Sequence, residues 1–393
     1  MKLVRPEELK ELEKYIISER RYLHMHPEVG FAVADTHDHI ANELDKLGII
    51  VHRHVGLNSV VGVIENKKGP TLGLRADTDA LPLEELNEVV YKSKNLGKMH
   101  ACGHDAHTAM LLGAAKYLVN NKDKWHGTLK LFFQEAEEGP HPGGAKGIID
   151  SGLVDDVDSV FALHVSPEYP TGTFAIKEGV AFASASTFRI YLRGKGCHGA
   201  YPQLGINPLT IQAEVVKNIQ KIVFEKLPPR DKAAISVTQV HGGTTHNIIP
   251  DDVFLEGTIR CFSSSAKALI KAEFERILQA ASKKHGNTYE FQFIEDYDAL
   301  INTADAFSRF QNTVTSLFGE RAFKELENPT MVGEDFFRYI NKAKSGAICW
   351  LGTKNDENTG NSLHSPRFNI DESALVKGVV VLINLITNYK RSE

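Results

Sequence analysis

The sequence predicts an α/β domain, with helices flanking a mixed sheet, into which a smaller ferredoxin-like α+β domain is inserted. Three observations support this fold class. The chain has 393 residues, more than one ordinary hydrophobic core organises. From about residue 30 to 180, short apolar runs alternate with segments of helical period, as in sheets covered by helices. From about residue 184 the order becomes strand, helix, strand, strand, helix, strand.

The larger domain begins with "MKLVRPEELKELEKYI", which predicts a charged amphipathic helix over residues 1–16. Apolar runs predict strands at residues 60–64, 72–76, 128–133 and 160–165. Residues 106–119 have apolar side chains at the spacing of a core helix, and Asp105 is a suitable N-cap. After the insertion, the apolar run "GAICWLGT" and the closing helical segment "SALVKGVVVLINLITNYK" resume the strand and helix pattern of residues 30–180. The larger domain is therefore expected to be discontinuous, over residues 1–183 and 297–393.

The inserted domain is expected over residues 184–296. Its strands are predicted at residues 184–196, 234–243, 252–262 and 288–295, and its helices at 207–224 and 267–286. This order is the split unit in which two helices cover one face of a four-stranded antiparallel sheet.

Composition narrows the classes of partner. Apolar residues make up 42% and charged residues 24% of the chain, and the net charge of -5 is spread without a basic block. We therefore expect no nucleic acid and no anionic membrane as a partner, and a small molecule as substrate. No uncharged run is long enough to span a bilayer, and the first residues lack an apolar secretory core, so we expect a cytoplasmic protein.

Polar side chains follow the predicted strands at the points where they end. "RADTDALP" follows one strand, "QEAEEGP" follows another, and His164 closes "SVFALH". Ligands of open α/β sheets bind beyond the carboxyl ends of the strands, so these clusters could meet at one site. Packing Asp77 and Asp79 with the carboxylates of the second cluster is unfavourable without a cation, which predicts a bound metal ion.

The stretch "MHACGHDAHTAM" at residues 99–110 adds further metal-ligand types. Cys102 and His104 offer a thiolate and an imidazole two residues apart, and both suit zinc, cobalt, nickel or manganese sites. Each feature also has a plainer explanation: a C-x-H triplet can be coincidental, an E-x-E-E run is usually a solvated surface, and a single histidine is often a core residue. Cys102 with His104 as base could also form a thiol hydrolase, although two residues on one turn seldom reach proton-transfer geometry. Four widely spaced cysteines argue against a disulfide framework.

A series of motifs occurs in order along almost the whole chain: "HMHPEVGF", "LRADTDALP", "HACGHDAHTAMLLGAA", "AEEGPHPGGAKGII", "ALHVSPEYPTG", "GKGCHGAYPQLGINP", "GGTTHNIIPD", "EGTIRCF", "GEDF" and "HSPRF". The set resembles the co-catalytic metallopeptidases and amidohydrolases that include carboxypeptidase G, aminoacylase and hippurate hydrolase. It is most similar to the branch of N-acyl-amino-acid and indole-acetyl-amino-acid amidohydrolases. The resemblance implies a dinuclear-metal catalytic domain and an inserted lid domain that often mediates dimerisation.

Carried over residue by residue, the resemblance implies two divalent ions per subunit, of zinc, manganese, nickel or cobalt. It makes the metal ligands Cys102, His104, Glu138, His164 and His364. Glu137 would be the general base, supported by Asp79. In the lid, His198 would stabilise the carbonyl oxyanion, typically in the partner subunit's site, and Asn247 and Arg260 would hold the substrate's carboxylate or carbonyl groups.

The expected activity is hydrolysis of the amide bond of N-acyl amino acids, in a homodimer or higher homo-oligomer formed through the lid. The alternative with the same chemistry is a dipeptidase or aminopeptidase, which the carboxylate of Glu135 near the pocket mouth would favour. Glu135 stands where the family has proline, Ser166 where it often has tryptophan, and Pro140-His141 are additional loop residues. These departures leave the acyl-group preference open. A metal-binding or assembly module without activity is disfavoured because the base and all ligands are present.

Overall fold

The computed structural model describes residues 3–389 and divides into two compact units. The larger unit comprises Met1–Ala181, Ile301–Asn328 and Asp335–Glu393, and the smaller one Phe182–Leu300 with Pro329–Glu334. We expected the two changes of domain after residues 183 and 296. No sequence pattern indicates that residues 329–334 belong with the smaller unit. Residues 1–2 and 390, at the ends of the first and last expected helices, lie outside the described part of the chain.

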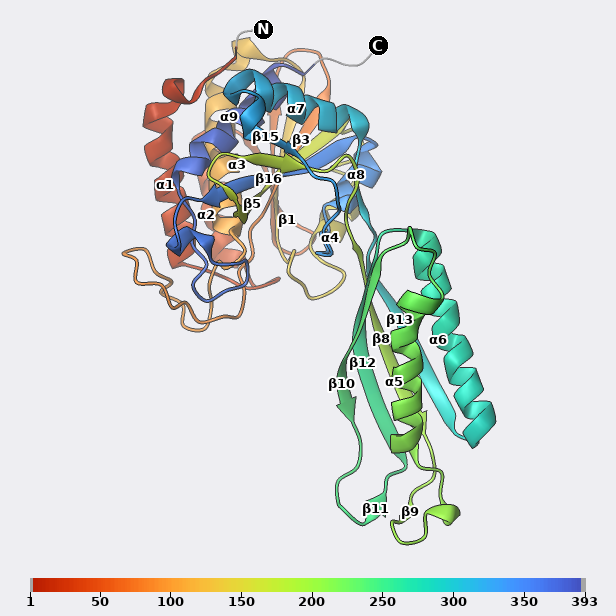
Figure 1. Ribbon diagram of the computed structural model, residues 1–393. Coiled ribbons are helices and arrows are strands. Elements are labelled where there is room, and N and C mark those ends of the chain that lie inside the picture. The colour runs from red at the N-terminus through yellow and green to blue at the C-terminus, as the bar shows by residue number, and fades with distance from the viewer. Residues whose placement is uncertain (1–2, 390–393) are drawn as a thin grey trace. The chain divides into compact units, whose positions relative to one another are not determined.

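The larger unit contains a mixed sheet of eight strands in the order β1-β2-β4-β3-β5-β16-β6-β15 (Figure 1). Its strands are β1 (Ile50–Val55), β2 (Ser59–Glu65), β3 (Thr71–Asp77), β4 (Thr128–Gln134), β5 (Ser159–Pro170), β6 (Phe174–Ile176), β15 (Phe323–Glu325) and β16 (Gly346–Lys354). The neighbours β4, β3, β5 and β16 run parallel, whereas β1 and β2 are antiparallel to their neighbours. β2, β3, β4 and β5 confirm the four expected strands, and "GAICWLGT" lies in β16.

Helices pack against this sheet. They are α1 (Lys10–Met25), α2 (Ala34–Lys46), α3 (His104–Asn120), α4 (Ala145–Asp150), α7 (Ala304–Phe318), α8 (Phe337–Ala343) and α9 (Ser373–Thr387). α3 contacts α1, α9 and β3, and Leu72, Leu74 and Ala76 of β3 share one apolar core with them. Because side chains alternate along a strand, Phe132 of β4 points to the other face, where its ring lies 5.3 Å from that of Tyr339 in α8. Helices therefore cover both faces of the sheet, as predicted for this fold class.

Two expected helix starts are wrong in detail. The stretch 1–16 is not one helix, because a 3-10 turn over Pro6–Leu9 precedes α1. α3 begins at His104, two positions before the expected start, and Asp105 does not cap it. Gly103 holds the N-cap position in the left-handed region at φ 86°, which glycine adopts readily, and Asp105 is instead buried in the first turn.

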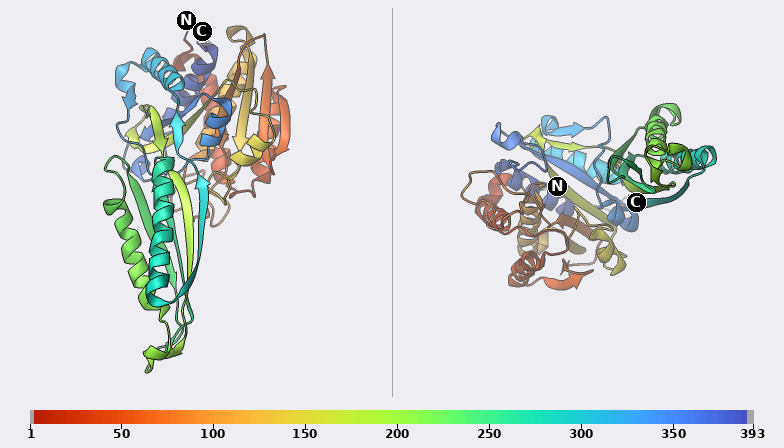
Figure 2. Two further views of the ribbon diagram at one scale, coloured as in Figure 1. Left: turned by 90° about the vertical axis from the view of Figure 1, so that its right-hand side faces the viewer. Right: turned by 90° about the horizontal axis from the view of Figure 1, so that it is seen from below.

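The smaller unit is a four-stranded antiparallel sheet with two helices. Its elements are β8 (Ser184–Arg193), α5 (Pro208–Glu225), β10 (Ala233–His241), β12 (Asp252–Cys261), α6 (Ser264–His285) and β13 (Thr288–Tyr297). The strand order β10-β12-β8-β13 and the placement of α5 and α6 on one face confirm the ferredoxin-like prediction (Figure 2). In β12, buried residues alternate with more accessible ones, as expected when helices cover one face of a sheet.

Short elements complete the described chain. The pair β9 (Cys197–His198) and β11 (Ile248–Ile249) extends beyond one end of the smaller sheet, and β7 (Gly179–Phe182) pairs with β14 (Leu300–Asn302). The remaining 3-10 turns are Lys122–Lys124, Pro202–Leu204, Glu320–Ala322 and Asn358–Gly360. Over residues 3–389, the structure contains no helix with the length and apolar character needed to cross a bilayer.

Candidate metal centre

The ends of two adjacent parallel strands, β3 and β4, place the acidic residues of the site. Asp77 is the last residue of β3, Asp79 follows it, and Glu137 and Glu138 follow the end of β4. We expected His164 to be the last residue of its strand. It lies instead inside β5, which continues to Pro170. The pairing of β3 with β5 nevertheless ends at Arg75 and Ala162, so His164 lies beyond the part of β5 that β3 covers.

The turn before α3 supplies the sulfur and a further imidazole. Gly103 separates Cys102 from His104, and a Cβ atom at Gly103 would lie 2.2 Å from Cγ2 of Val165. The position therefore requires glycine both for its left-handed backbone and for the close approach of β5. This approach brings Sγ of Cys102 to 3.6 Å from Nε2 of His164.

The structure brings together the five side chains expected as ligands. Candidate groups, each with its ligand atoms within 4.8 Å of one another, are Cys102 with His104 and His164, Cys102 with Glu138 and His364, and His104 with Glu137 and Glu138. Nε2 of His364 lies 2.8 Å from Oε1 of Glu138. The groups share members, so they form one continuous cluster in the larger unit.

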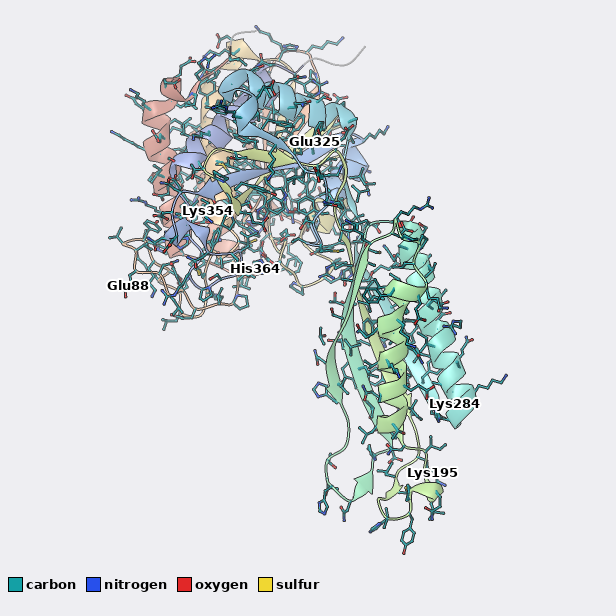
Figure 3. The ribbon with its side chains drawn as sticks, viewed as in Figure 1. Glu88, Lys195, Lys284, Glu325, Lys354 and His364 are labelled. Carbon is teal, nitrogen blue, oxygen red and sulfur yellow. The ribbon has the colours of Figure 1, made fainter. Side chains whose placement is uncertain are left out.

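His364 comes from a loop that no local pattern marks as a site. Its backbone N–H donates to the carbonyl of Ala101 at 2.8 Å, which holds the loop beside Cys102. It adopts φ 62°, a conformation uncommon for residues other than glycine and often found at functional sites. The side chain of His364 is 52% exposed, whereas those of His104 and His164 are buried. Figure 3 labels His364 in the larger unit.

Asp79 organises the two glutamates. Its carboxylate accepts the backbone N–H of Glu137 at 3.0 Å and that of Glu138 at 3.1 Å. Oδ1 of Asp79 also lies 3.3 Å from Nδ1 of His104. Glu137 and Glu138 lie on a bend after β4, and both carboxylates belong to a candidate group with His104.

The donor set fits a divalent cation. Both ring nitrogens of His104 and Oε1 of Glu138 are buried without a hydrogen bond of normal geometry, although buried polar atoms are nearly always satisfied. Burial and the nearby carboxylates raise the pKa of the Cys102 thiol well above its usual value. Burial alone would lower the pKa of His104, but Asp77 and Asp79 raise it to about 10. An excess of negative groups around sulfur and imidazole is the environment that a zinc-type ion neutralises.

The carboxylate of Glu135 is not part of this cluster, which corrects the expectation that it lies near the pocket mouth. The side chain is buried and accepts the backbone N–H groups of Leu57 and Asn58 at 3.1 and 3.0 Å. Burial raises the pKa of Glu135, and those backbone donors oppose the rise. Glu135 therefore stabilises the turn between β1 and β2 through these hydrogen bonds.

Sequence reasoning missed a set of buried supports. Nδ1 of His107 lies 2.5 Å from Oδ1 of Asp77, and Arg75 pairs with Asp77 at 2.6 Å and with Asp335 at 2.8 Å. Burial would raise the pKa of Asp77, but His104, Arg75 and His107 hold it well below its usual range. His107 and Asp335 occur in the motifs "HACGHDAHTAM" and "GEDF", so their presence was visible, but the contacts that they make were not.

The three residues expected in substrate binding lie at two ends of the smaller unit. His198 in β9 and Asn247 are neighbours, because Gly199 N–H donates to the Asn247 carbonyl at 2.8 Å. Lys195, labelled in Figure 3, marks this end. At this end of the sheet, Asp252 of β12 pairs with Arg193 of β8. Arg260 lies near the opposite end, where Cys261 of β12 pairs with Ser184 of β8. At about 3.3 Å per residue, the strand from 252 to 260 spans roughly 26 Å.

The model of Peptidase family M20/M25/M40 matches residues 73–388. The chain is 40% identical over 377 residues to thermostable carboxypeptidase 2 of Saccharolobus solfataricus, covering 95% of each chain. It is 34% identical over 380 residues to IAA-amino acid hydrolase ILR1-like 4 of Arabidopsis thaliana, covering 95% of this chain and 86% of the relative. The crystal structure of the Bacillus subtilis YXEP protein, described as a dinuclear metal binding peptidase, superposes with a TM-score of 0.83 at 29% identity, over 96% and 98% of the two chains. The motifs, the fold and these similarities together show that the chain belongs to the M20 family of metallopeptidases and amidohydrolases.

Proposed function

We propose that the protein hydrolyses the amide bond of N-acyl amino acids, with two divalent cations held by Cys102, His104, Glu138, His164 and His364. The observation that supports this most strongly is the meeting of sulfur, imidazole and carboxylate groups from four distant segments, among them buried atoms without a hydrogen bond of normal geometry. Zinc, manganese, nickel and cobalt all accept this combination of ligands. The dinuclear YXEP protein and the amino-acid-conjugate hydrolase of Arabidopsis add support by similarity.

The proposal assigns a role to each of the chain's own residues. Cations bound here lower the pKa of water and polarise a carbonyl group. Glu137 accepts the proton of the attacking water and returns it to the leaving amine, as a positioned carboxylate does in general acid–base catalysis. Asp79 fixes the backbone of Glu137 and Glu138 together, so that the base keeps its place relative to the ligand beside it.

Cys102 acts in this proposal as a ligand and not as a nucleophile. Nε2 of His164 lies 3.6 Å from its sulfur, and a nitrogen of His104, the base required by the thiol-hydrolase alternative, lies within 4.8 Å, so two imidazoles surround the sulfur as they would in a metal site. Burial raises the pKa of the thiol, which opposes formation of a free thiolate. Inactivation by iodoacetamide together with full resistance to chelators would favour the thiol mechanism.

The lid residues support an oligomeric active form. A small substrate cannot touch both His198 and Arg260 of one chain, because they lie near opposite ends of the smaller unit. We infer that His198 and Asn247 serve the site of a second copy, where His198 stabilises the carbonyl oxygen, and that Arg260 grips the substrate carboxylate. The guanidinium of Arg260 bonds to the Thr258 hydroxyl and, at 3.1 Å, to the Ile259 carbonyl.

The second candidate is hydrolysis of short peptides, the activity of a dipeptidase or aminopeptidase. The similarity to a carboxypeptidase at 40% identity favours a peptide substrate. The carboxylate of Glu135 no longer supports it, because that side chain is turned onto the β1–β2 turn and is not available to a free α-amino group.

The test compares blocked and unblocked substrates on one preparation. Metal-depleted protein is reconstituted separately with zinc, manganese, nickel and cobalt, and metal content is measured before and after chelation. N-acetyl and N-benzoyl amino acids are compared with the corresponding free dipeptides. Faster release from the N-acyl compounds, dependent on restored metal, supports the proposal. Faster release from the dipeptides supports the second candidate, and turnover of neither class by protein loaded with two ions contradicts both.

A further inference from the structure

His107 lies on the first turn of α3, three residues after His104, and its side chain is buried. It also belongs to a candidate group with Asp77 and His104, so proximity alone makes it a sixth possible ligand. Both of its ring nitrogens are already engaged, however. Nδ1 lies 2.5 Å from Oδ1 of Asp77, and Nε2 accepts the backbone N–H of Val165 at 2.9 Å.

These two contacts define the tautomer of His107. A backbone amide can only donate, so Nε2 of His107 must carry a lone pair and the ring proton must be on Nδ1, where it donates to Asp77. Asp77 is itself held by Arg75 at 2.6 Å, and its backbone carbonyl accepts from Thr108 at 3.0 Å. The ring is therefore anchored on one side and directed at the backbone of β5 on the other.

Val165, the residue that His107 holds, connects the parts of the metal centre. Its carbonyl accepts from Nδ1 of His164 at 2.8 Å, which leaves Nε2 of His164 directed at Sγ of Cys102. Its side chain fills the space above Gly103, where a Cβ atom would come within 2.2 Å. The rings of His107 and His164 also lie edge to face, with centroids 4.5 Å apart.

We propose that His107 is a positioning residue of the metal centre: through the Val165 backbone it sets the tautomer and ring orientation of the ligand His164, and it does not bind metal itself. The inference rests on the proposed function, because it assumes that His164 binds a cation. Partners of this kind, which orient a ligand imidazole from outside, change metal affinity by about 10- to 100-fold when they are removed.

Two substitutions separate the two contacts of the ring. In His107→Asn the amide lies where Nδ1 was, so it still donates to Asp77 but cannot reach the Val165 N–H. In His107→Gln the amide oxygen lies where Nε2 was, so it still accepts from Val165 but loses the bond to Asp77. A ligand role predicts that both variants lose one ion per chain, whereas the positioning role predicts that they differ.

The experiment titrates metal-free wild type and both variants with cobalt(II), following the thiolate-to-cobalt absorption band and the final number of ions bound. We expect two ions per chain in all three proteins, and an affinity about 10- to 100-fold weaker in His107→Asn, with His107→Gln nearer to wild type. Equal affinity in the two variants, or loss of an ion in either, overturns the inference. Leu111→Val, another buried position of α3, controls for lost packing.

A second measurement determines the tautomer of His107 in the wild-type protein and uses a variant only to assign the signals. Histidine-labelled, metal-loaded wild type is examined by long-range proton–nitrogen correlation spectra, with the signals of His107 assigned by their absence from His107→Gln. We expect His107 to be protonated at Nδ1 and uncoordinated at Nε2. A proton on Nε2, or a metal-shifted nitrogen, overturns the inference. Failure of wild type itself to bind two ions would contradict the proposed function instead, so the two failures are distinguishable.

Discussion

Two buried polar clusters lie side by side at the start of α3, and they differ in how their charges are balanced. His104 points into the metal centre, where its Nδ1 lies 3.3 Å from Oδ1 of Asp79 and its ring shares candidate groups with Cys102, Glu137 and Glu138. Its neighbour Asp105 points into a second group, called here the Arg20 cluster: Arg20, His24, Glu85, Asp105 and Glu372. In that cluster Arg20 pairs with Asp105 at 2.9 Å and with Glu372 at 3.2 Å, and His24 lies 2.7 Å from Asp105 and 3.2 Å from Glu85.

The comparison indicates that the Arg20 cluster stabilises the fold, whereas the metal centre is incomplete without a bound cation. Both are buried, and consecutive residues of one helix contribute to them. The carboxylates of the Arg20 cluster have cationic partners within the chain, because Arg20, His24 and the neighbouring Arg21 contact them. Arg75 pairs with Asp77 at the edge of the metal centre, but the centre also gathers Asp79, Glu137 and Glu138 around a thiol and an imidazole, which favours a cation from outside. Substitutions in the first cluster should therefore change stability, and substitutions in the second should change metal binding or turnover.

The largest effect is expected for Glu137→Gln. The amide keeps the shape of the side chain but cannot accept a proton, so kcat should fall by about 10²- to 10⁴-fold while two metal ions remain bound. Steady-state kinetics and elemental analysis of the same preparation measure both. Glu135→Gln is the matched control two residues away, and it should retain turnover because the carboxylate of Glu135 faces the β1–β2 turn. A wild-type rate in Glu137→Gln would remove it as the base.

The Arg20 cluster should respond in the opposite way. Arg20→Met leaves Asp105 as a buried charge with His24 as its remaining cationic partner, so the free energy of unfolding should fall by about 3–5 kcal/mol. Chemical denaturation of metal-free protein measures this. Arg21→Met removes a partly exposed guanidinium from the same Glu372 and should cost about 1 kcal/mol or less. Loss of bound metal without loss of stability in Arg20→Met would show that the two clusters are not separate.

Cys102→Ala tests the sulfur as a ligand. Metal affinity should fall by more than about 10-fold, because loss of a ligand exceeds loss of an outer partner, and activity should fall with it. The stability of the metal-free protein should change little, since the thiol is buried among carboxylates that do not favour its thiolate. Cys261→Ala, at a buried cysteine of the smaller unit, is the control. Unchanged metal stoichiometry and affinity in Cys102→Ala would make the cysteine structural.

The smallest effect concerns pH. Burial and Arg20 lower the pKa of His24, but Asp105 and Glu85 outweigh them and raise it above its usual value. A raised pKa in the folded state means that protonated His24 stabilises the fold below its unfolded pKa of about 6.5, and that this stabilisation is lost as pH rises through the folded value. Metal-free wild type should therefore lose stability over that window, whereas His24→Gln should show a flatter profile. Identical pH profiles for the two proteins would contradict the role of His24.

Local sequence determined much of this architecture. The periods of apolar residues placed β2, β3, β4 and β5, and the ferredoxin-like order was readable because each element packs one face against a core. The residue types at strand ends also indicated the chemistry, since carboxylate, thiol and imidazole groups together favour a cation whatever their exact contacts. Periodicity and composition are properties of neighbouring residues, so a single sequence displays them.

Only the tertiary structure decided which polar groups belong to the site. The carboxylate of Glu135 accepts backbone N–H groups of the β1–β2 turn instead of joining the centre. His107 shares a candidate group with Asp77 and His104, but its two ring nitrogens contact Asp77 and Val165. His364, in a loop without periodicity, came beside Cys102 through one backbone bond to Ala101. The physical reason is that a buried polar atom takes the nearest suitable partner in space, and that partner is often distant in the chain, so no local pattern records it.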